Sequence, residues 1–164
     1  MTISKRILAT SVALVLMTGT GIALSQTTKL TCVNVGPNIP EPLGDRDGHA
    51  VQVSAGACTA EGGLLNGMVM TQDTIWETEI SKGMFNTLSG HGVGRTPSAT
   101  VVYSITDGAL TMIMKDGRPA GWTVAGKARY TLATGSAAGL AGKNFSFTGY
   151  ATGPRSYVLE LKLD

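Results

Sequence analysis

Residues 99–117 read ATVVYSITDGALTMIMKDG, and this stretch decides which fold the sequence predicts. It contains two Asp-Gly pairs, Asp107-Gly108 and Asp116-Gly117, and each pair follows a segment of strand-like composition. Asp-Gly tolerates the positive φ angles of tight hairpin turns, so both pairs predict turns between antiparallel strands. The stretch is therefore interpreted as the start of a β-meander that continues to Leu163.

The segment that follows, Gly121–Thr134, alternates most regularly along the chain. Its even positions are mostly apolar and its odd positions mostly polar, which predicts a half-buried strand. A small-residue link at Ser136–Lys143 comes next, and one helical turn is expected there. Two further strands are expected at Asn144–Gly153 and Arg155–Leu163.

The first half of the chain predicts four more strands, at Lys29–Val35, His49–Ala57, Met68–Ile80 and Met84–Val93. An irregular loop is expected at Gly36–Gly48, because its three prolines and three glycines disfavour regular structure. Glycines at 90, 92 and 94 leave one face of a strand bare, which allows sharp coiling or the close approach of another element.

These segments predict an all-β fold, an antiparallel meander of about eight or nine strands. A sheet of this size usually closes or doubles over, because open strand edges invite aggregation. We expect an eight-stranded barrel, which can hold packed side chains or one small ligand. A two-sheet β-sandwich is the alternative.

Residues 1–25 have the pattern of a signal peptide. Lys5 and Arg6 precede the apolar run Ile7–Met17, and Ala23-Leu24-Ser25 supplies small residues where a signal peptidase reads, so cleavage is predicted after Ser25. Residues 26–164 would then be a single secreted or periplasmic β-barrel domain. The alternative is an uncleaved membrane anchor, for which the apolar run is short against a span of roughly 20 residues.

Charge gives no support for a polyanionic partner. Without Lys5 and Arg6 the chain carries 11 basic and 11 acidic side chains, a formal net charge of zero. The electrostatic argument for nucleic acid or an anionic membrane surface is therefore missing. We expect no nucleic-acid partner, no membrane insertion after cleavage and no cofactor. The sequence leaves the oligomeric state open.

Cys32 and Cys58 are the two cysteines of the chain. In an exported protein an even pair predicts a disulfide, because the compartment is oxidising. A redox pair or a metal site is the alternative. There is no CxxC spacing, and the two histidines, His49 and His91, are distant in sequence from the pair. No metal site is expected.

The segment Ala133–Tyr150, ATGSAAGLAGKNFSFTGY, resembles the Gly-rich hairpin of the allene oxide cyclase barrel-like and dirigent-like families. A strand ends in Thr134-Gly135, a link with a Gly-x-x-Gly spacing follows, and a strand with alternating aromatic residues returns. The resemblance implies a calycin-like, eight-stranded antiparallel barrel with an apolar cavity open at one end. Some members cyclise or isomerise a bound apolar substrate. No position here matches a catalytic motif of those enzymes, and the cysteine pair and the Pro-rich loop depart from the pattern.

Motifs of common catalysis are absent: there is no G-x-S-x-G, no H-E-x-x-H, no P-loop and no dinucleotide fingerprint. The remaining acid–base candidates are Glu77, next to Trp76, and His91, between two glycines. For each of them, a solvated or hydrogen-bonded surface residue is the favoured interpretation. Arg95 is a candidate for binding a ligand carboxylate. Four aromatic residues are candidates either for a pocket lining or for ordinary core: Trp76, Tyr103, Trp122 and Tyr130.

Three functions follow as hypotheses. The first is an exported barrel that binds a small apolar molecule in its cavity. The second is an isomerase or cyclase acting on an apolar substrate in the barrel, with Glu77 or His91 as the titratable group. The third is a non-catalytic structural or interaction protein of the envelope, which has no pocket.

Overall fold

The computed structural model describes residues 27–164, and within them the chain forms nine strands and three single-turn 3-10 helices. The predicted signal peptide, residues 1–25, lies outside the described residues. The strands are β1 (Thr27–Val35), β2 (Pro40–Pro42), β3 (His49–Glu61), β4 (Val69–Glu79), β5 (Met84–Thr96), β6 (Ala99–Lys115), β7 (Arg118–Gly135), β8 (Asn144–Ala151) and β9 (Ser156–Leu163). The 3-10 helices are η1 (Gly63–Leu65), η2 (Ile80–Lys82) and η3 (Ala138–Leu140).

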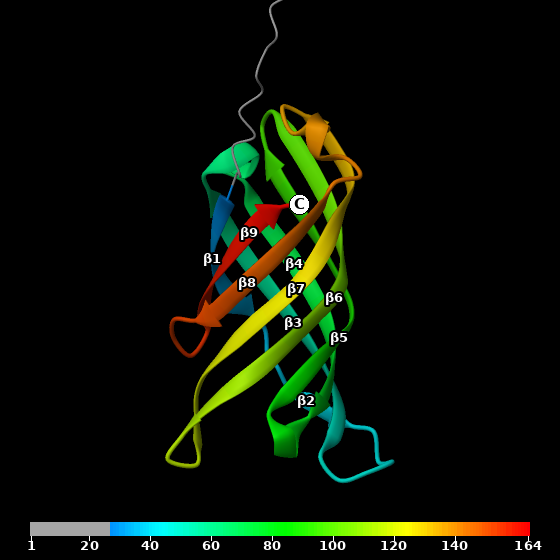
Figure 1. Ribbon diagram of the computed structural model, residues 1–164, viewed down its shortest axis with the longest axis vertical. Coiled ribbons are helices and arrows are strands. Elements are labelled where there is room, and N and C mark those ends of the chain that lie inside the picture. Colours follow the sequence, from blue (N-terminus) through cyan, green and yellow to red (C-terminus); the bar gives the residue numbers. More distant parts are fainter. Residues whose placement is uncertain (1–26) are drawn as a thin grey trace, which may run out of the picture.

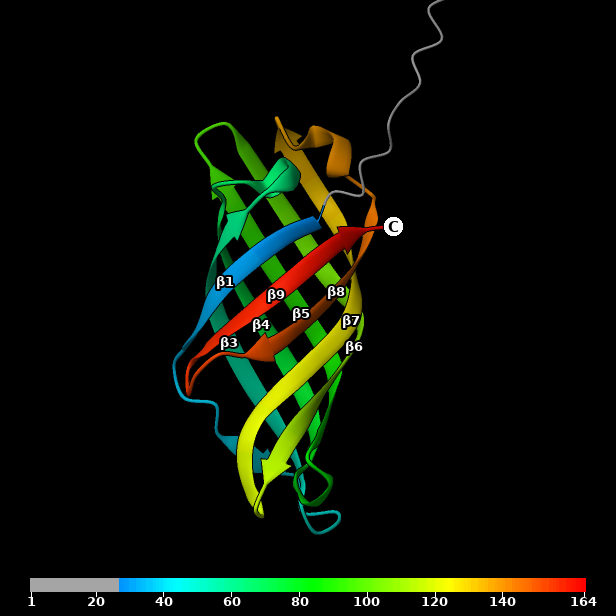
Figure 2. The ribbon, with the colours of Figure 1, turned by 60° about the vertical axis from the view of Figure 1, so that its left-hand side comes forward.

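Eight of these strands close into an antiparallel barrel (Figure 1). From β3 to β9 each strand pairs with the next along the chain, and β1 then pairs with both β9 and β3. Figure 2 shows β1 lying beside β9 as the ring closes. The closed ring confirms the predicted eight-stranded barrel and excludes the two-sheet sandwich. We call the pairing of β1 with β3 the closing seam.

The ninth strand, β2, lies outside the ring. It pairs with residues 50–52 of β3, on the edge that β1 uses further along. The expectation of an irregular loop over Gly36–Gly48 was therefore wrong for its centre. Proline has no backbone N–H to donate to a neighbouring strand. In a three-residue edge strand with one neighbour few hydrogen bonds are lost in this way, so Pro40 and Pro42 are tolerated there.

One of the two predicted Asp-Gly turns is confirmed. Asp116 and Gly117 join β6 to β7 with φ angles of 52° and 73°. The turn predicted at Asp107-Gly108 is wrong, because β6 runs through it unbroken.

Gly108 lies opposite Gly126 of β7, and Phe147 of β8 packs over this pair. A Cβ atom on Gly126 would lie 2.4 Å from the Cζ atom of Phe147. A Cβ atom on Gly108 itself would lie 2.8 Å from Oγ1 of Thr87, so this glycine makes room for a neighbouring side chain and does not change the direction of the chain.

One half of the barrel interior is solidly packed, at the end that η1 and η3 cover (Figure 1). Rings of Tyr130 and Phe145 have centroids 4.5 Å apart, and Tyr103 meets both edge-on. We call this packed half the plug: Leu65, Met68, Met70, Val101, Tyr130, Leu140 and Phe145, each no more than 2 % exposed. The expected helical turn in Ser136–Lys143 is confirmed as η3, which contributes Leu140.

The predicted disulfide is confirmed between Cys32 of β1 and Cys58 of β3, which are direct partners across the closing seam. Both cysteines are buried among the plug residues. The covalent link therefore holds the two strands whose pairing closes the ring. Among residues 27–164, no cluster of metal-ligating side chains is found, and no helix is long and apolar enough to cross a membrane.

Candidate ligand-binding cavity

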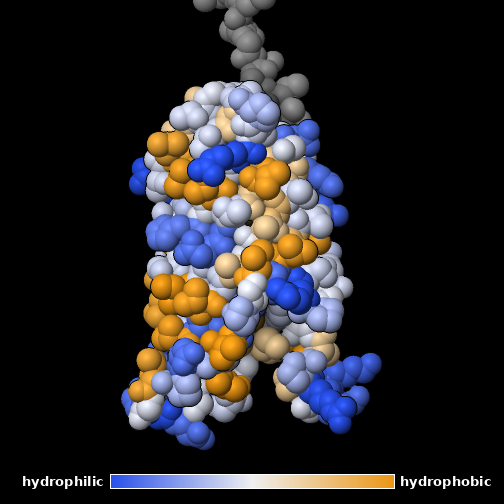
Figure 3. Space-filling view, turned by 180° about the vertical axis from the view of Figure 1, so that it is seen from behind, coloured by the Kyte–Doolittle hydropathy of each residue, from blue (hydrophilic) through white to orange (hydrophobic). Residues whose placement is uncertain are grey.

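The other half of the barrel encloses a cavity of about 270 Å³. Side chains from all eight strands of the ring line it, and Asn38 and Pro154 join them from the loops after β1 and β8. The cavity opens at the end opposite η1 and η3, where Figure 3 shows the surface hollowed between two projecting segments. The barrel is therefore a cup, with the plug as its base.

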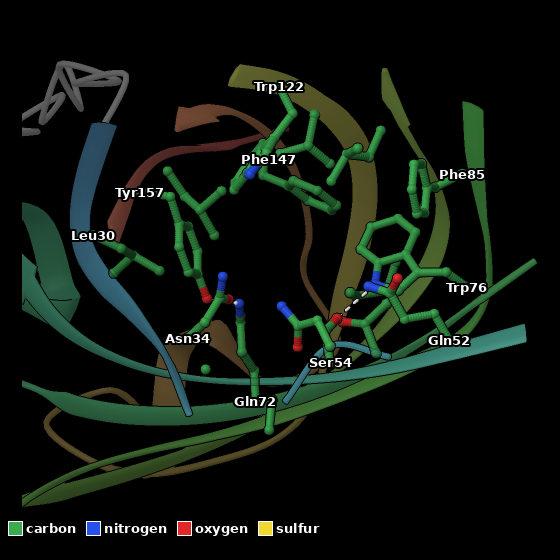
Figure 4. Close-up of a pocket in the computed structure, with 18 of the residues that line it drawn as sticks. Leu30, Asn34, Gln52, Ser54, Gln72, Trp76, Phe85, Trp122, Phe147 and Tyr157 are labelled. Atoms are coloured by element: carbon green, nitrogen blue, oxygen red, sulfur yellow. Dashed lines mark hydrogen bonds between the residues drawn. The ribbon is translucent and has the colours of Figure 1, made fainter. Parts of the chain in front are cut away.

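The lining divides into two walls (Figure 4). Strands β5 to β9 supply an apolar wall, on which Trp122 and Phe147 face Asn34, Ser54 and Gln72 across the cavity. Strands β1, β3 and β4 supply the opposite wall, which is mostly polar. The apolar wall consists of Phe85, Ile105, Leu110, Met112, Trp122, Val124, Phe145, Phe147, Leu159 and Leu161. The polar wall consists of Asn34, Gln52, Ser54, Gln72 and Thr74.

A hydrogen-bonded chain crosses the deep end of the cavity. The Tyr103 hydroxyl donates to Oε1 of Gln72 at 2.7 Å, and Nε2 of Gln72 donates to the Tyr157 hydroxyl at 2.9 Å. Glycines make room for both phenol rings. A Cβ atom on Gly56 would lie 2.1 Å from the Tyr157 hydroxyl, and one on Gly92 would lie 2.2 Å from Cζ of Tyr103.

Burial raises the pKa of Tyr103 and Tyr157 above the ordinary value of a phenol. Both phenols therefore stay protonated near neutral pH and act as hydrogen-bond donors. Higher on the wall, the indole N–H of Trp76 donates to Oγ of Ser54 at 2.6 Å, which fixes the plane of that ring. The polar groups at this site can orient a ligand by hydrogen bonding.

The cavity lining contains no Asp, Glu, Lys, Arg or His. Moving an ion from water into such a site without an opposite charge is costly, because the lost hydration is not replaced. The lining is thus suited to uncharged molecules.

Three of the residues predicted to line a pocket do so: Trp76, Tyr103 and Trp122. Tyr130 also points inward but lies in the plug, below the cavity. Arg95 lies elsewhere. It is exposed near the end of β5, at the plugged end of the barrel, so it does not reach the cavity.

Neither acid–base candidate lies in the cavity lining. His91 is exposed on the outside of β5, where its Nδ1 atom lies 3.1 Å from Oγ of Ser104. Glu77 lies on the outer face of β4, 2.8 Å from His49. Both have the parity opposite to the inward residues of their strands, since Trp76 and Gly92 face the interior.

The structure also brings in residues that sequence reasoning missed, above all Gln72, Tyr157 and Asn34. For Gln72 a signal was present, because it shares the even-numbered face of its strand with Trp76. Asn34 and Tyr157 come from strands distant in sequence, β1 and β9, which meet the site only after the ring has closed.

A charged cluster lies outside the barrel at the open end. His49 is only 7 % exposed, and its ring lies between two carboxylates, with Nδ1 2.5 Å from Asp45 and Nε2 2.8 Å from Glu77. Arg46 lies 3.7 Å from Glu77 and 3.4 Å from Glu79. The cluster ties the loop between β2 and β3 to strand β4.

The protonation state of His49 determines how many hydrogen bonds its ring can donate to the two carboxylates. A neutral imidazole has one N–H, whereas the imidazolium can donate to both carboxylates. Hydrogen bonds with Asp45 and Glu77 therefore raise the pKa of His49, and the bond from His49 lowers the pKa of Asp45. The stabilisation from His49 is complete below about pH 6.5 and is lost as the pH rises through its raised pKa. The stabilisation from Asp45 is complete above about pH 3.9 and is lost as the pH falls through its lowered pKa.

We therefore expect His49→Gln to flatten the pH dependence of stability. Between about pH 5.5 and about pH 8.5 the melting temperature of the wild type should fall by more than that of H49Q, because only the wild type has an imidazolium that is deprotonated in this range. Thermal unfolding followed by circular dichroism at the two pH values checks this. An equal loss in the two proteins would show that His49 does not titrate in this range.

No family model, curated protein or solved structure matches this chain. The functional argument therefore comes from the cavity itself: its two walls, its hydrogen-bonded chain and its lack of charge.

Proposed function

We propose that this protein is an exported β-barrel that binds a small, mainly apolar molecule in its cavity. The observation that carries the proposal is the cavity of about 270 Å³, with a continuous apolar wall and a few polar groups facing it. This is the usual composition of small-molecule sites, whose volumes are roughly 300–1,000 Å³ for drug-sized ligands. The ligand is therefore expected to be small.

Export is part of the proposal. Residues 1–25 have the charge, the apolar run and the small residues of a cleaved signal peptide. The Cys32–Cys58 disulfide is of the kind that persists in a periplasmic or extracellular compartment. The resemblance of Ala133–Tyr150 to the allene oxide cyclase barrel-like and dirigent-like families agrees with a cavity-bearing barrel.

The cavity favours binding over catalysis. The titratable side chains in its lining are Tyr103 and Tyr157, and their raised pKa values keep both protonated. A cyclase or isomerase that works by general acid–base catalysis uses a group that exchanges a proton near neutral pH. Glu77 and His91, the candidates for that role, lie on the outer face. The hypothesis of an envelope protein without a pocket is not favoured by a barrel that leaves half of its interior open.

Filling the cavity should abolish binding. We expect an uncharged apolar probe, 2-ethylnaphthalene, to bind the wild type and to raise its melting temperature, because binding to the folded state alone stabilises it. Leu110→Trp replaces an aliphatic side chain in the cavity by a larger aromatic one. This variant should neither bind the probe nor show a rise in melting temperature. Isothermal titration calorimetry and thermal unfolding check this.

Leu132→Trp is the matched control, since Leu132 lies on the same barrel but is 46 % exposed on the outside. It adds the same side chain to the surface and should leave binding unchanged. If the wild type and L110W respond alike to 2-ethylnaphthalene, the cavity is not the binding site and the proposal fails.

A further inference from the structure

We propose that the ligand is an uncharged, two-sided molecule that has an apolar face and one edge with a hydrogen-bond acceptor, such as a carbonyl oxygen. This proposal rests on the binding function above and specifies the chemical class of its ligand. Its apolar face lies against Trp122 and Phe147, and its acceptor points to the Tyr157 hydroxyl.

The separation of the two walls is the first support. In Figure 4 the carboxamides of Asn34, Gln52 and Gln72 lie on one side of the cavity, opposite Trp122 and Phe147. A hydrocarbon that filled the cavity would take water away from these polar groups without replacing its hydrogen bonds. Such a loss costs roughly 1–3 kcal/mol for each group. A ligand with a polar edge avoids that cost.

The hydrogen-bonded chain is the second support. Two phenol protons, on Tyr103 and Tyr157, face one amide oxygen, that of Gln72. With Tyr103 donating to that oxygen, the Tyr157 hydroxyl accepts from the amide nitrogen and keeps its own proton. If the side-chain amide of Gln72 is turned by 180°, the two tyrosines exchange their roles as donor and acceptor. One phenol proton is again left without an acceptor on Gln72. The deep end of the cavity thus offers a donor that Gln72 does not use.

The lack of charge is the third support. A ligand carboxylate or ammonium would find no opposite charge in the lining. Tyr157 offers a proton without a formal charge, which suits a neutral acceptor such as a ketone, ester or amide oxygen. The same groups select against an anion of similar shape, which would lose its hydration for a single hydrogen bond.

Three naphthalenes of similar shape separate these features. They are 2-acetylnaphthalene, which has a carbonyl acceptor, 2-ethylnaphthalene, which has none, and 2-naphthoate, which is an anion. We expect the ketone to bind about tenfold more tightly than the hydrocarbon, the difference that one hydrogen bond supplies, and naphthoate to bind most weakly. Calorimetric titration of the full-length mature protein measures all three dissociation constants.

Tyr157→Phe should weaken binding of the ketone about tenfold and leave binding of the hydrocarbon unchanged. Tyr130→Phe is the matched control, because it removes a hydroxyl from a phenol in the plug, and it should change neither. Gln72→Met is a second variant, which removes the central link of the chain and should also reduce the preference for the ketone.

The outcomes distinguish the two proposals. If the hydrocarbon and the ketone bind equally, or naphthoate binds best, the ligand class is wrong while the binding function stands. If the preference for the ketone survives in both Y157F and Q72M, the hydrogen-bonded chain does not select the ligand. If none of the three probes binds, the proposed function fails as well.

Discussion

Replacing Cys32 and Cys58 together by alanine is expected to lower the free energy of unfolding by about 3.5 kcal/mol. The disulfide closes a loop with a sequence separation of 26 residues, and removing a link of that length returns roughly this much entropy to the unfolded chain. The site of the link adds to its effect, because the two cysteines are direct partners in the closing seam. Urea unfolding of the oxidised wild type and the double variant measures the change.

The seam should open locally before the rest of the barrel. Amide hydrogen exchange in the double variant should accelerate most in β1, whose neighbour β9 lies at the opposite end of the described chain, and least in the β6–β7 hairpin. Wild type reduced with dithiothreitol is the control, because it breaks the link but keeps both sulfur atoms in the core. A loss below about 1 kcal/mol in both samples would show that closure does not depend on the disulfide.

Gly92→Ala is expected to destabilise the barrel by about 3 kcal/mol, although it adds a single methyl group. That group would lie 2.2 Å from Cζ of Tyr103, and Tyr130 and Phe145 hold this ring from the other side. Overpacking of this kind typically costs 1–3 kcal/mol, and displacing the ring also weakens its hydrogen bond to Gln72, worth about 1 kcal/mol. Urea unfolding checks the value.

Gly139→Ala is the matched control. Gly139 lies in η3, and a Cβ atom there meets nothing within 4 Å. That variant should stay within about 0.5 kcal/mol of the wild type. Combining G92A with Tyr103→Leu, which replaces the obstructing ring, should make the effects of the two substitutions clearly non-additive. If they add, steric conflict with Tyr103 is not the cause of the loss.

Short-range sequence patterns predicted a turn correctly where the backbone conformation of the pattern itself determines the structure. Asp116-Gly117 forms a hairpin turn because both residues adopt positive φ, which this pair of residue types tolerates. Asp107-Gly108 carries the same local signal and forms no turn. A Cβ atom on Gly108 would lie 2.8 Å from Oγ1 of Thr87 on the neighbouring strand β5, and short-range patterns contain no information about such a contact.

Alternation predicted which residues share a face of a strand, but not which face is inside. The acidic odd positions of β4 indicate that its even face, which carries Trp76 and Gln72, is the inward one. In β5 the one charged residue, Arg95, stands at the end of the strand, on the same parity as His91 and opposite to the glycines. The division of the cavity into two walls is a property of the whole ring. It depends on β1, β3 and β4 being neighbours, and their order follows from the closing seam.

Both ends of the described chain lie at the plugged pole of the barrel. Thr27 begins β1 beside Lys162 of β9, and Figure 1 shows the C-terminus near η3. A tag, a bead or an anchoring partner attached at either end would therefore hold the cup by its base. The open end of the cavity would face away from the attachment point. Immobilised protein should therefore bind and release its ligand as freely as protein in solution.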